Sequence, residues 1–411
     1  MSRLVIKNVG PIREVDIELR RFNVLIGEQS SGKSTIAKVL STCMWVEKEV
    51  STTLDEHAIK SGEDFKELFE RFHKMMGYFD NKSEVHYKSN YVSIDYMGGG
   101  LCIHLEKNSE YRRQKICYIP AERNMVTLPE LQGFEFGVTN IRSFLFDWFD
   151  ARSLFTEENK ANVLKLGVKY FYDDGQLRYK DRIEHVNGKT YQIPLSSASS
   201  GLQSVVPLYI MLQYYSSTYF DQFDDKFSYV TKEKNRKMRQ AVTDIYILSQ
   251  YHPAGESVER TVLIEKLNEE IKSGDPEALR LLKEYREIVD RLSTPVKTTF
   301  VIEEPEQNLF PDTQLQLVEL LIQFCQKDRP HGFTITTHSP YIANYLNILL
   351  HQNQKEKGWV DAKDLNVFAV CDGGVQNLMA KNEHDEWIVN TFDLTEQMQR
   401  IFEEYQSLKN E

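Results

Sequence analysis

A phosphate-binding loop constrains the fold of this chain more than any other feature of its sequence. Residues 27–34 read Gly-Glu-Gln-Ser-Ser-Gly-Lys-Ser, which fits the pattern G-x-x-x-x-G-K-[S/T]. The apolar run 22–26 predicts a buried strand before the loop, and residues 35–40, without glycine or proline, predict a helix after it. A strand, a glycine loop and a helix in this order are typical of an α/β domain that holds phosphate groups.

Each part of this loop has a chemical purpose. The glycines let main-chain N–H groups curl around phosphate oxygens, and the start of the following helix adds a partial positive charge. We expect Lys33 to reach the β- and γ-phosphates and the Ser34 hydroxyl to bind Mg²⁺. The alternative, a chance Gly/Ser loop before a helix, does not account for the matched flanks. The residues predicted to contact the nucleotide are Gly27, Glu28, Gln29, Ser30, Ser31, Gly32, Lys33, Ser34 and Thr35.

Composition limits the class of protein. The 411 residues suffice for one large domain or two ordinary ones, and an apolar fraction of 41% supports a sizeable core. No apolar run approaches the length of a bilayer span, and the N-terminus lacks the apolar segment of a signal peptide, so we expect a cytoplasmic protein. The scattered cysteines include no C-x-x-C pair, which argues against disulfides and a zinc site. A net charge of −11 argues against a protein that coats nucleic acid with its whole surface.

Local patterns predict both strands and helices, and no Pro/Gly/Ser-rich linker divides the chain. We therefore expect a single domain over residues 1–411. The expected elements are an opening hairpin of strands at 3–8 and 15–20, a helical segment at 46–80, a β-meander at 85–107, a strand at 115–119, a mainly helical segment at 139–172 and a hairpin at 183–193.

A pair of acids follows the apolar, β-branched run 298–302, which predicts a buried parallel strand. Acids at the carboxyl end of such a strand lie where α/β nucleotide folds place their metal and water chemistry. We expect Glu303 to hold the Mg²⁺ shell, through water, and Glu304 to orient or deprotonate the attacking water. Neighbouring side chains on a strand point to opposite sides, so the two acids should not share one role. The alternative is a strand that ends in a solvated acidic turn.

Two further groups are candidates for the same chemistry. His338 follows the next expected strand, 332–337, where it can bond to the γ-phosphate or the attacking water; a purely structural histidine is the alternative. Ser199, Ser200 and Gly201 precede an apolar helix. Small hydroxyl residues at a helix start can form a second anion site, although an ordinary helix cap explains them equally simply.

Taken in series, these motifs resemble an ATPase of the ATP-binding-cassette type, in the branch of the SMC and OLD (overcoming lysogenization defect) proteins. The motifs run in the family's order from residue 3 to about residue 375, and segments 118–123 and 301–311 belong to the series. The resemblance implies an α/β P-loop NTPase fold of the ABC ATPase head type, with a mixed β-sheet core, an antiparallel β subdomain and a helical insertion. By position, residues 27–35 match Walker A and residues 199–201 match the signature loop.

The resemblance also implies an activity, with ATP and Mg²⁺ as cofactors. Glu303 matches the Walker B acid, Glu304 the catalytic acid and His338 the switch histidine, so the implied catalytic residues are Lys33, Glu304 and His338. Ser34 and Glu303 are then the metal ligands. In this family two heads sandwich two ATP molecules, so the signature loop contacts ATP held by the partner. The resemblance therefore implies an ATP-dependent homodimer or a larger even assembly.

The sequence departs from the family pattern in several places. Glu303 stands where cassette transporters usually have Asp, and the signature reads Ala198-Ser-Ser-Gly where Leu-Ser-Gly-Gly is usual. No glutamine matches the transporter Q-loop, and Arg123 occupies roughly that place. Arg123 is a candidate contact to phosphate or Mg²⁺-bound water, with a structural salt bridge as the alternative.

Residues 215–293 separate the signature motif from Walker B, and their periodicity predicts a few helices. A solvated helix face, or a contact to nucleic acid or a partner, would explain the basic cluster Lys232, Lys234, Arg236, Lys237 and Arg239. OLD nucleases carry a Toprim nuclease domain after the ATPase. The residues that follow His338 are too few for one, so we expect no C-terminal Toprim domain here.

These observations favour a cytoplasmic ATPase that regulates or scaffolds a separate effector, a nuclease or toxin, as in antiphage systems with OLD-like ATPases. The alternative is an SMC-like ATPase of DNA repair or chromosome maintenance that acts on DNA directly. The interrupted spacing between signature and Walker B argues against a transporter subunit. Intact Lys33 and Glu304 argue against a degenerate nucleotide-binding scaffold.

Overall fold

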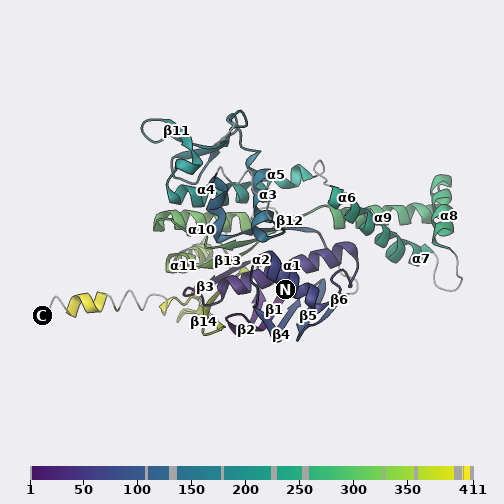
Figure 1. The fold of residues 1–411 in the computed structure, drawn as a ribbon, viewed down its shortest axis with the longest axis horizontal. Helices are drawn as coiled ribbons and strands as arrows, with labels where there is room; N and C mark the ends of the chain where they lie inside the picture. The colour runs from purple at the N-terminus through teal and green to yellow at the C-terminus, as the bar shows by residue number, and fades with distance from the viewer. Residues whose placement is uncertain are drawn as a thin grey trace.

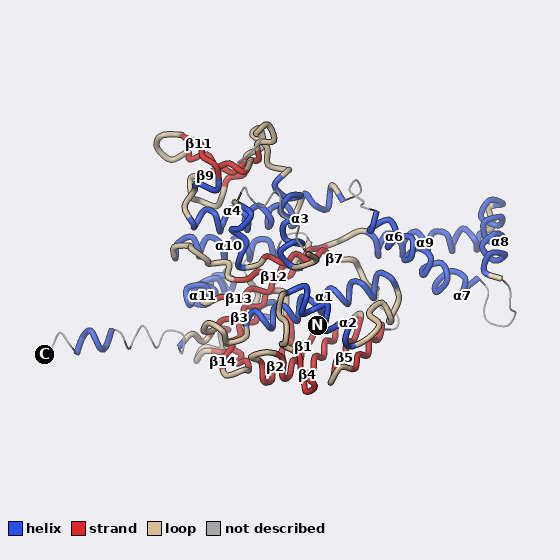
Figure 2. The backbone as a smooth tube through the Cα atoms, in the orientation of Figure 1, coloured by secondary structure: helices blue, strands red, loops and turns tan. Residues whose placement is uncertain are grey.

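The computed structural model places a helix-flanked parallel sheet beside an antiparallel sheet, with a helical arm projecting to one side (Figures 1 and 2). The predicted mixed α/β fold is confirmed. The structure describes residues 2–106, 110–128, 137–176, 180–223, 229–251, 259–326, 329–355, 360–392, 400 and 402–407.

The central sheet brings the predicted functional segments to one edge. Its strand order is β15-β14-β3-β13-β12-β7, and the strands from β14 to β7 run parallel. Because parallel strands end at the same edge, the phosphate loop after β3, the acids at the end of β12 and His338 after β13 meet there. The strands are β3 (Phe22–Ile26), β7 (Gln114–Ile119), β12 (Lys297–Glu303), β13 (Gly332–Thr337), β14 (Leu365–Cys371) and the antiparallel β15 (Gly374–Asn377).

A second, antiparallel sheet has the order β2-β1-β4-β5-β6 and confirms the predicted opening hairpin and β-meander. Helices α1 (Lys33–Thr53) and α2 (Gly62–His73) supply most of the helical segment expected at 46–80, and β4 begins within it. Apolar side chains of α1, the antiparallel sheet and one face of the central sheet share a single core. The strands are β1 (Ser2–Val9), β2 (Ile12–Leu19), β4 (Phe79–Lys88), β5 (Val92–Met97) and β6 (Gly100–Leu105).

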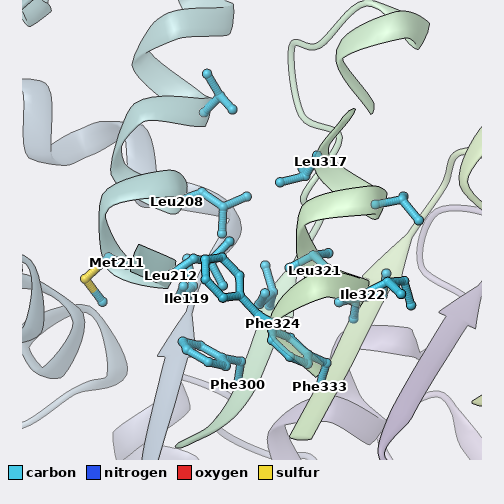
Figure 3. Packing of buried hydrophobic residues seen from close by; sticks show 14 of the residues in the cluster. Ile119, Leu208, Met211, Leu212, Phe300, Leu317, Leu321, Ile322, Phe324 and Phe333 are labelled. Atoms are coloured by element: carbon cyan, nitrogen blue, oxygen red, sulfur yellow. The ribbon is translucent and has the colours of Figure 1, made fainter. Parts of the chain in front are cut away.

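The other face of the central sheet packs against helices. Figure 3 shows Leu212 from α4 and Leu321 from α10 meeting Phe300 and Phe333 from the sheet. The two phenylalanine rings stack with centroids 5.0 Å apart. Burial of one such side chain contributes about 1.5–3 kcal/mol, so helices on both faces hold the sheet rigid. The helices on this side are α3 (Asn140–Arg152), α4 (Ser200–Tyr215), α10 (Pro311–Gln326) and α11 (Pro340–Lys355).

The segment 139–172 was expected to be mainly helical, and beyond Arg152 that prediction is wrong. Aromatic and β-branched residues between Val168 and Tyr172 favour an extended chain, and β9 pairs there with β10 of the confirmed hairpin. Together they form a small sheet of β8 (Ala161–Asn162), β9 (Val168–Tyr172), β10 (Asp181–His185) and β11 (Tyr191–Pro194).

The helices from α6 to α9, between residues 229 and 293, form the projecting arm, on the right of Figure 1. Its base is tied to the central sheet, because the Arg113 N–H donates to the Arg291 carbonyl at 3.1 Å and the Val296 N–H donates back to Arg113 at 2.9 Å. Among the described helices, none is long and apolar enough to cross a membrane. The short helix α5 (Thr218–Asp221) precedes the arm and packs against α4. The arm contains α6 (Tyr229–Val242), a π-helical turn (Thr243–Leu248), α7 (Ser249–Tyr251), α8 (Arg260–Ser273) and α9 (Pro276–Ser293).

Short elements complete the described fold. A two-stranded ribbon follows the central sheet in the chain and packs on α11 through hydrogen bonds between Asn347 and Val389. The short elements are β16 (Met379–Lys381), β17 (Trp387–Val389) and 3₁₀ turns at Ala121–Thr127, Leu195–Ser197 and Ala362–Asp364.

Candidate functional site

The phosphate loop lies between β3 and α1, and its glycines are required by close contacts. Gly32 has φ 107°, and a Cβ there would lie 2.4 Å from Cδ1 of Ile12. A Cβ on Gly27 would lie 2.4 Å from the carbonyl oxygen of Val370. Larger residues at either position would displace the loop, so the geometry of the loop explains why both positions are glycine.

The Lys33 side chain lies inside the phosphate loop and bonds to its main chain. Only 4% of the residue is exposed, and its Nζ donates to the carbonyl oxygens of Gly27 at 2.9 Å and Glu28 at 2.5 Å. Burial lowers the pKa of Lys33, and the nearby acids Glu304 and Glu306 oppose that shift. The ammonium group thus sits among loop carbonyls, where a bound phosphate could replace these acceptors, and the loop fits a nucleotide.

A line of contacts joins the predicted catalytic residues. His338 Nδ1 lies 3.4 Å from Lys33 Nζ, and His338 Nε2 lies 3.2 Å from Glu304 Oε1. An ammonium group only donates, so Nδ1 is the acceptor and Nε2 carries the proton that bonds to Glu304. The main-chain N–H of His338 donates to Glu306 Oε1 at 2.7 Å and fixes the ring's position. Lys33, His338 and Glu304 therefore form one connected group.

The backbone of Glu304 is held in a rare conformation. Its φ of 45° lies in the left-handed region, which costs about 1–3 kcal/mol for a residue with a side chain. Its N–H donates to the Thr336 carbonyl at 2.9 Å, and its own carbonyl accepts from Arg123 Nη2 at 2.7 Å. Bonds on both sides of the residue thus hold the carboxylate in place.

Arg123 bonds to main-chain carbonyl groups, a role that the sequence did not indicate. Its side chain is 0% exposed, and it forms no ion pair with a residue that the structure describes. Burial lowers its pKa to about 10, so it remains charged at neutral pH. Because main-chain carbonyls satisfy the whole guanidinium group, it cannot reach a phosphate without breaking them. Its acceptors are the carbonyl oxygens of Pro120, Ser204, Glu303, Glu304 and Pro305.

Glu303, the last residue of β12, has partners that differ from those of Glu304. It is buried, accepts a hydrogen bond from the Tyr118 hydroxyl and lies 3.6 Å from Lys38 Nζ. Burial raises the pKa of Glu303, while Lys38 and a hydrogen bond from the Ser34 side chain oppose that shift. The two predicted metal ligands, Ser34 and Glu303, are therefore within hydrogen-bonding reach of each other.

These two ligands suit Mg²⁺ better than a metal that needs a protein cage. Mg²⁺ takes one or two protein oxygens and completes its shell with water and phosphate oxygens. In the parts of the chain that the structure describes, no group of three or more His, Cys, Asp or Glu could hold a metal. Ser34 and Glu303 would thus hold Mg²⁺ beside the phosphate loop, where its charge would neutralise phosphate oxygens.

The signature residues lie elsewhere. Ser199 caps α4, its Oγ accepting the N–H of Leu202 at 3.5 Å, and both Ser199 and Ser200 are exposed. Gly201 packs on the turn after the acids, where a Cβ would lie 2.9 Å from the Asn308 carbonyl oxygen. None of the three lines the cleft around Lys33. One copy of the chain therefore does not combine its signature loop with its own phosphate loop.

The cleft around Lys33 has a volume of about 640 Å³ and contains residues that sequence analysis missed. His73 lines it with both ring nitrogens buried and without a hydrogen-bond partner among the described residues. Burial lowers the pKa of His73 to about 3, so the ring is neutral. No sequence signal marks these residues, because they come from the end of α2 and from segments distant in sequence. The missed residues include His73, Lys74, Tyr78 and Asn140.

Comparison with known proteins gives fold-level similarity only. No protein-family model matches the chain, and no curated protein is similar to it. Among solved structures, the SMC head domain from Thermotoga maritima has a TM-score of 0.39 and 10% identity, covering 92% of this chain and 98% of that one.

Two further structures give comparable values. A dimeric ATP-binding cassette bound to ADP and phosphate has a TM-score of 0.32 and 11% identity, over 91% of this chain and 96% of that one. The recombination mediator RecF with ATP has a TM-score of 0.31 and 12% identity, over 92% and 98%. Because these scores are low, the fold assignment rests on the strand order and loop geometry described above.

Proposed function

We propose that the protein binds and hydrolyses ATP with Mg²⁺. The observation that carries this proposal is the connected group of Lys33, His338 and Glu304 beside the phosphate loop. Glu304 has the position of a general base for the attacking water, and His338 keeps its carboxylate oriented. Lys33 would stabilise charge on the transferred phosphoryl group.

The exposed signature loop supports a site completed by a second copy of the chain. Ser199 and Ser200 at the start of α4 offer hydroxyl and N–H groups to an anion, yet they lie outside their own cleft. The adjoining turn ends in Phe310, which is 73% exposed, and exposed aromatic residues are typical of interfaces. We propose a homodimer in which each ATP lies between one phosphate loop and the partner's signature loop.

Mixing two inactive variants tests this arrangement. Lys33→Ala removes the phosphate contact, and Ser200→Arg blocks the exposed signature loop, so each variant alone should lose about a hundredfold or more in ATP turnover. A mixed dimer contains one intact pair of half-sites, so mixing the two proteins should restore measurable phosphate release. The control mixes two differently tagged Lys33→Ala preparations, which should remain inactive. Mixed dimers that form but stay inactive would contradict the composite site.

The output of the ATPase is proposed to pass to a separate effector protein, such as a nuclease or toxin. The resemblance of the motifs to OLD-like ATPases supports this part of the proposal, with antiphage defence as its setting. The effector would respond to ATP-driven changes in the contacts between subunits.

A groove on the arm favours a second candidate function, direct action on DNA. The groove has a volume of about 710 Å³ between α6 and α9, and Arg236, Arg239 and Arg286 line it. Arginines gathered along a groove attract a phosphate backbone despite the negative net charge of the chain. The side chains of Lys232 and Lys234, also predicted here, lie outside the described residues.

Salt-dependent binding separates this candidate from the first. If DNA occupies the groove, the double variant Arg239→Gln, Arg286→Gln should bind duplex DNA more weakly at low salt. Its slope of log affinity against log salt should be shallower by about 1.8, because two phosphate contacts are lost. Lys272→Gln, which removes an exposed charge from α8, is the matched control. Fluorescence anisotropy measures both quantities, and an absence of binding by the wild type at low salt would exclude this function.

A further inference from the structure

A polar cavity lies at the edge of the central sheet opposite the phosphate loop. It has a volume of about 440 Å³, and the amino-terminal ends of β3, β7, β12 and β13 border it. We call it the edge cavity. Along β12, Lys297 in the lining of this cavity lies about 20 Å from Glu303, so the edge cavity is distinct from the nucleotide cleft.

Tyr111 is the first sign that the edge cavity is built to hold a ligand. The residue is 3% exposed, and its hydroxyl has no hydrogen-bond acceptor among the described residues. The ring is held by an edge contact with Tyr91, centroids 5.1 Å apart. A buried hydroxyl without an acceptor destabilises the fold, so such groups usually meet a ligand or an ordered water.

The charges around the edge cavity are strongly unbalanced. Among the described residues, four cationic side chains line it, whereas Glu47 is the one acidic residue of this described lining. This excess of positive charge contrasts with the net charge of −11 of the whole chain. A small cavity with such an excess attracts anions. The cationic residues are Arg20, Arg21, Arg112 and Lys297.

Lys297 is the cation placed to bind a ligand directly. Its amino group is largely buried and forms no ion pair with a residue that the structure describes, although Glu47 is near enough to influence it. Glu47 is 2% exposed and accepts a hydrogen bond from the Tyr87 hydroxyl at 2.9 Å. Burial lowers the pKa of Lys297 and raises that of Glu47, and an anion beside Lys297 would relieve the first shift.

The Tyr111 hydroxyl and the cations together define the chemistry of the ligand. We propose that the edge cavity binds a small anionic molecule, bearing a phosphate or carboxylate group and no larger than a mononucleotide. Its acidic group pairs with Lys297 and the neighbouring arginines, and one of its oxygens accepts the Tyr111 hydroxyl proton. The proposal does not depend on ATP hydrolysis.

The cavity contacts the same elements that carry the ATP site. Glu47 belongs to α1, which begins at Lys33, and Lys297 begins β12, which ends at Glu303. A ligand in the edge cavity therefore lies against the far ends of both elements. Its position suits a molecule that is sensed rather than transformed.

The test measures anion binding by the full chain with its nucleotide cleft filled. The protein is saturated with Mg²⁺ and a non-hydrolysable ATP analogue, and then titrated in a calorimeter with inorganic phosphate, adenosine monophosphate or citrate. We expect at least one of these to bind the wild type, which also identifies phosphate or carboxylate as the preferred group. Lys297→Gln should weaken that binding about tenfold or more, since a charge-assisted contact is lost.

Two further variants sharpen this test. Tyr111→Phe keeps the ring and its packing, so a severalfold loss of affinity would report the hydroxyl contact alone. Lys283→Gln removes an exposed lysine from α9 and should bind like the wild type. The proposal is overturned if none of the probes binds at millimolar concentration, if neutral adenosine binds as well as its monophosphate, or if neither cavity variant changes affinity.

Discussion

Replacing Glu304 with glutamine is expected to slow ATP hydrolysis by a factor of roughly 10²–10⁴, the usual contribution of a general base. Glutamine keeps the size of the side chain and an oxygen that can accept the His338 Nε2 proton at 3.2 Å, but it cannot take a proton from water. Nucleotide affinity should therefore change little, while phosphate release falls. Steady-state phosphate release and equilibrium nucleotide binding measure the two effects separately.

A matched control guards against indirect effects. Glu287→Gln makes the same chemical change on the exposed face of α9 and should leave turnover unaltered. Equal turnover by Glu304→Gln and the wild type would show that Glu304 is not the base. Loss of nucleotide binding together with turnover would instead indicate that the strained turn at φ 45° had collapsed.

Replacing Arg123 with methionine is expected to lower the free energy of unfolding by about 3–5 kcal/mol. Methionine fills much of the buried volume but donates no hydrogen bonds, so the carbonyl groups of Glu303 and Glu304 lose their donor. Glu304 should then leave its left-handed conformation, because one of the bonds that hold it is gone. Turnover should fall as well, even under conditions in which the variant remains folded.

Urea unfolding of the nucleotide-free protein measures this loss. Arg71→Met is the control, because Arg71 is exposed on α2 and its removal should change stability by less than about 0.5 kcal/mol. A loss below about 1 kcal/mol for Arg123→Met would contradict the importance of the carbonyl contacts. Unchanged turnover in the folded variant would show that Glu304 does not need this support.

Motifs confined to one strand end could be predicted from the sequence. The phosphate loop and the acids at the end of β12 each follow an apolar run, and the periodicity of that run marks both the strand and its end. Parallel strands then require these ends to share one edge of the sheet. The proximity of His338 to Lys33 follows from this rule, whereas the direction of the hydrogen bonds of the His338 ring could not be predicted from the sequence.

Contacts that use the main chain could not be predicted. Arg123 bonds to main-chain carbonyl oxygens. Because every residue carries such an oxygen, no pattern of side chains in the sequence predicts which ones Arg123 will contact. The position of the neutral, buried His73 in the cleft could not be predicted from the sequence either. The error beyond Arg152 has another cause: the strand β9 is stabilised by pairing with β10, a long-range contact that local periodicity does not report.

The position of Ser199 and Ser200 outside their own cleft has a kinetic consequence. An enzyme whose catalytic site is completed by a second copy of itself has a specific activity that depends on dilution. Below the dissociation constant of the pair, total turnover rises with the square of protein concentration. In the proposed homodimer, a twofold rise in cellular abundance would then raise total turnover about fourfold.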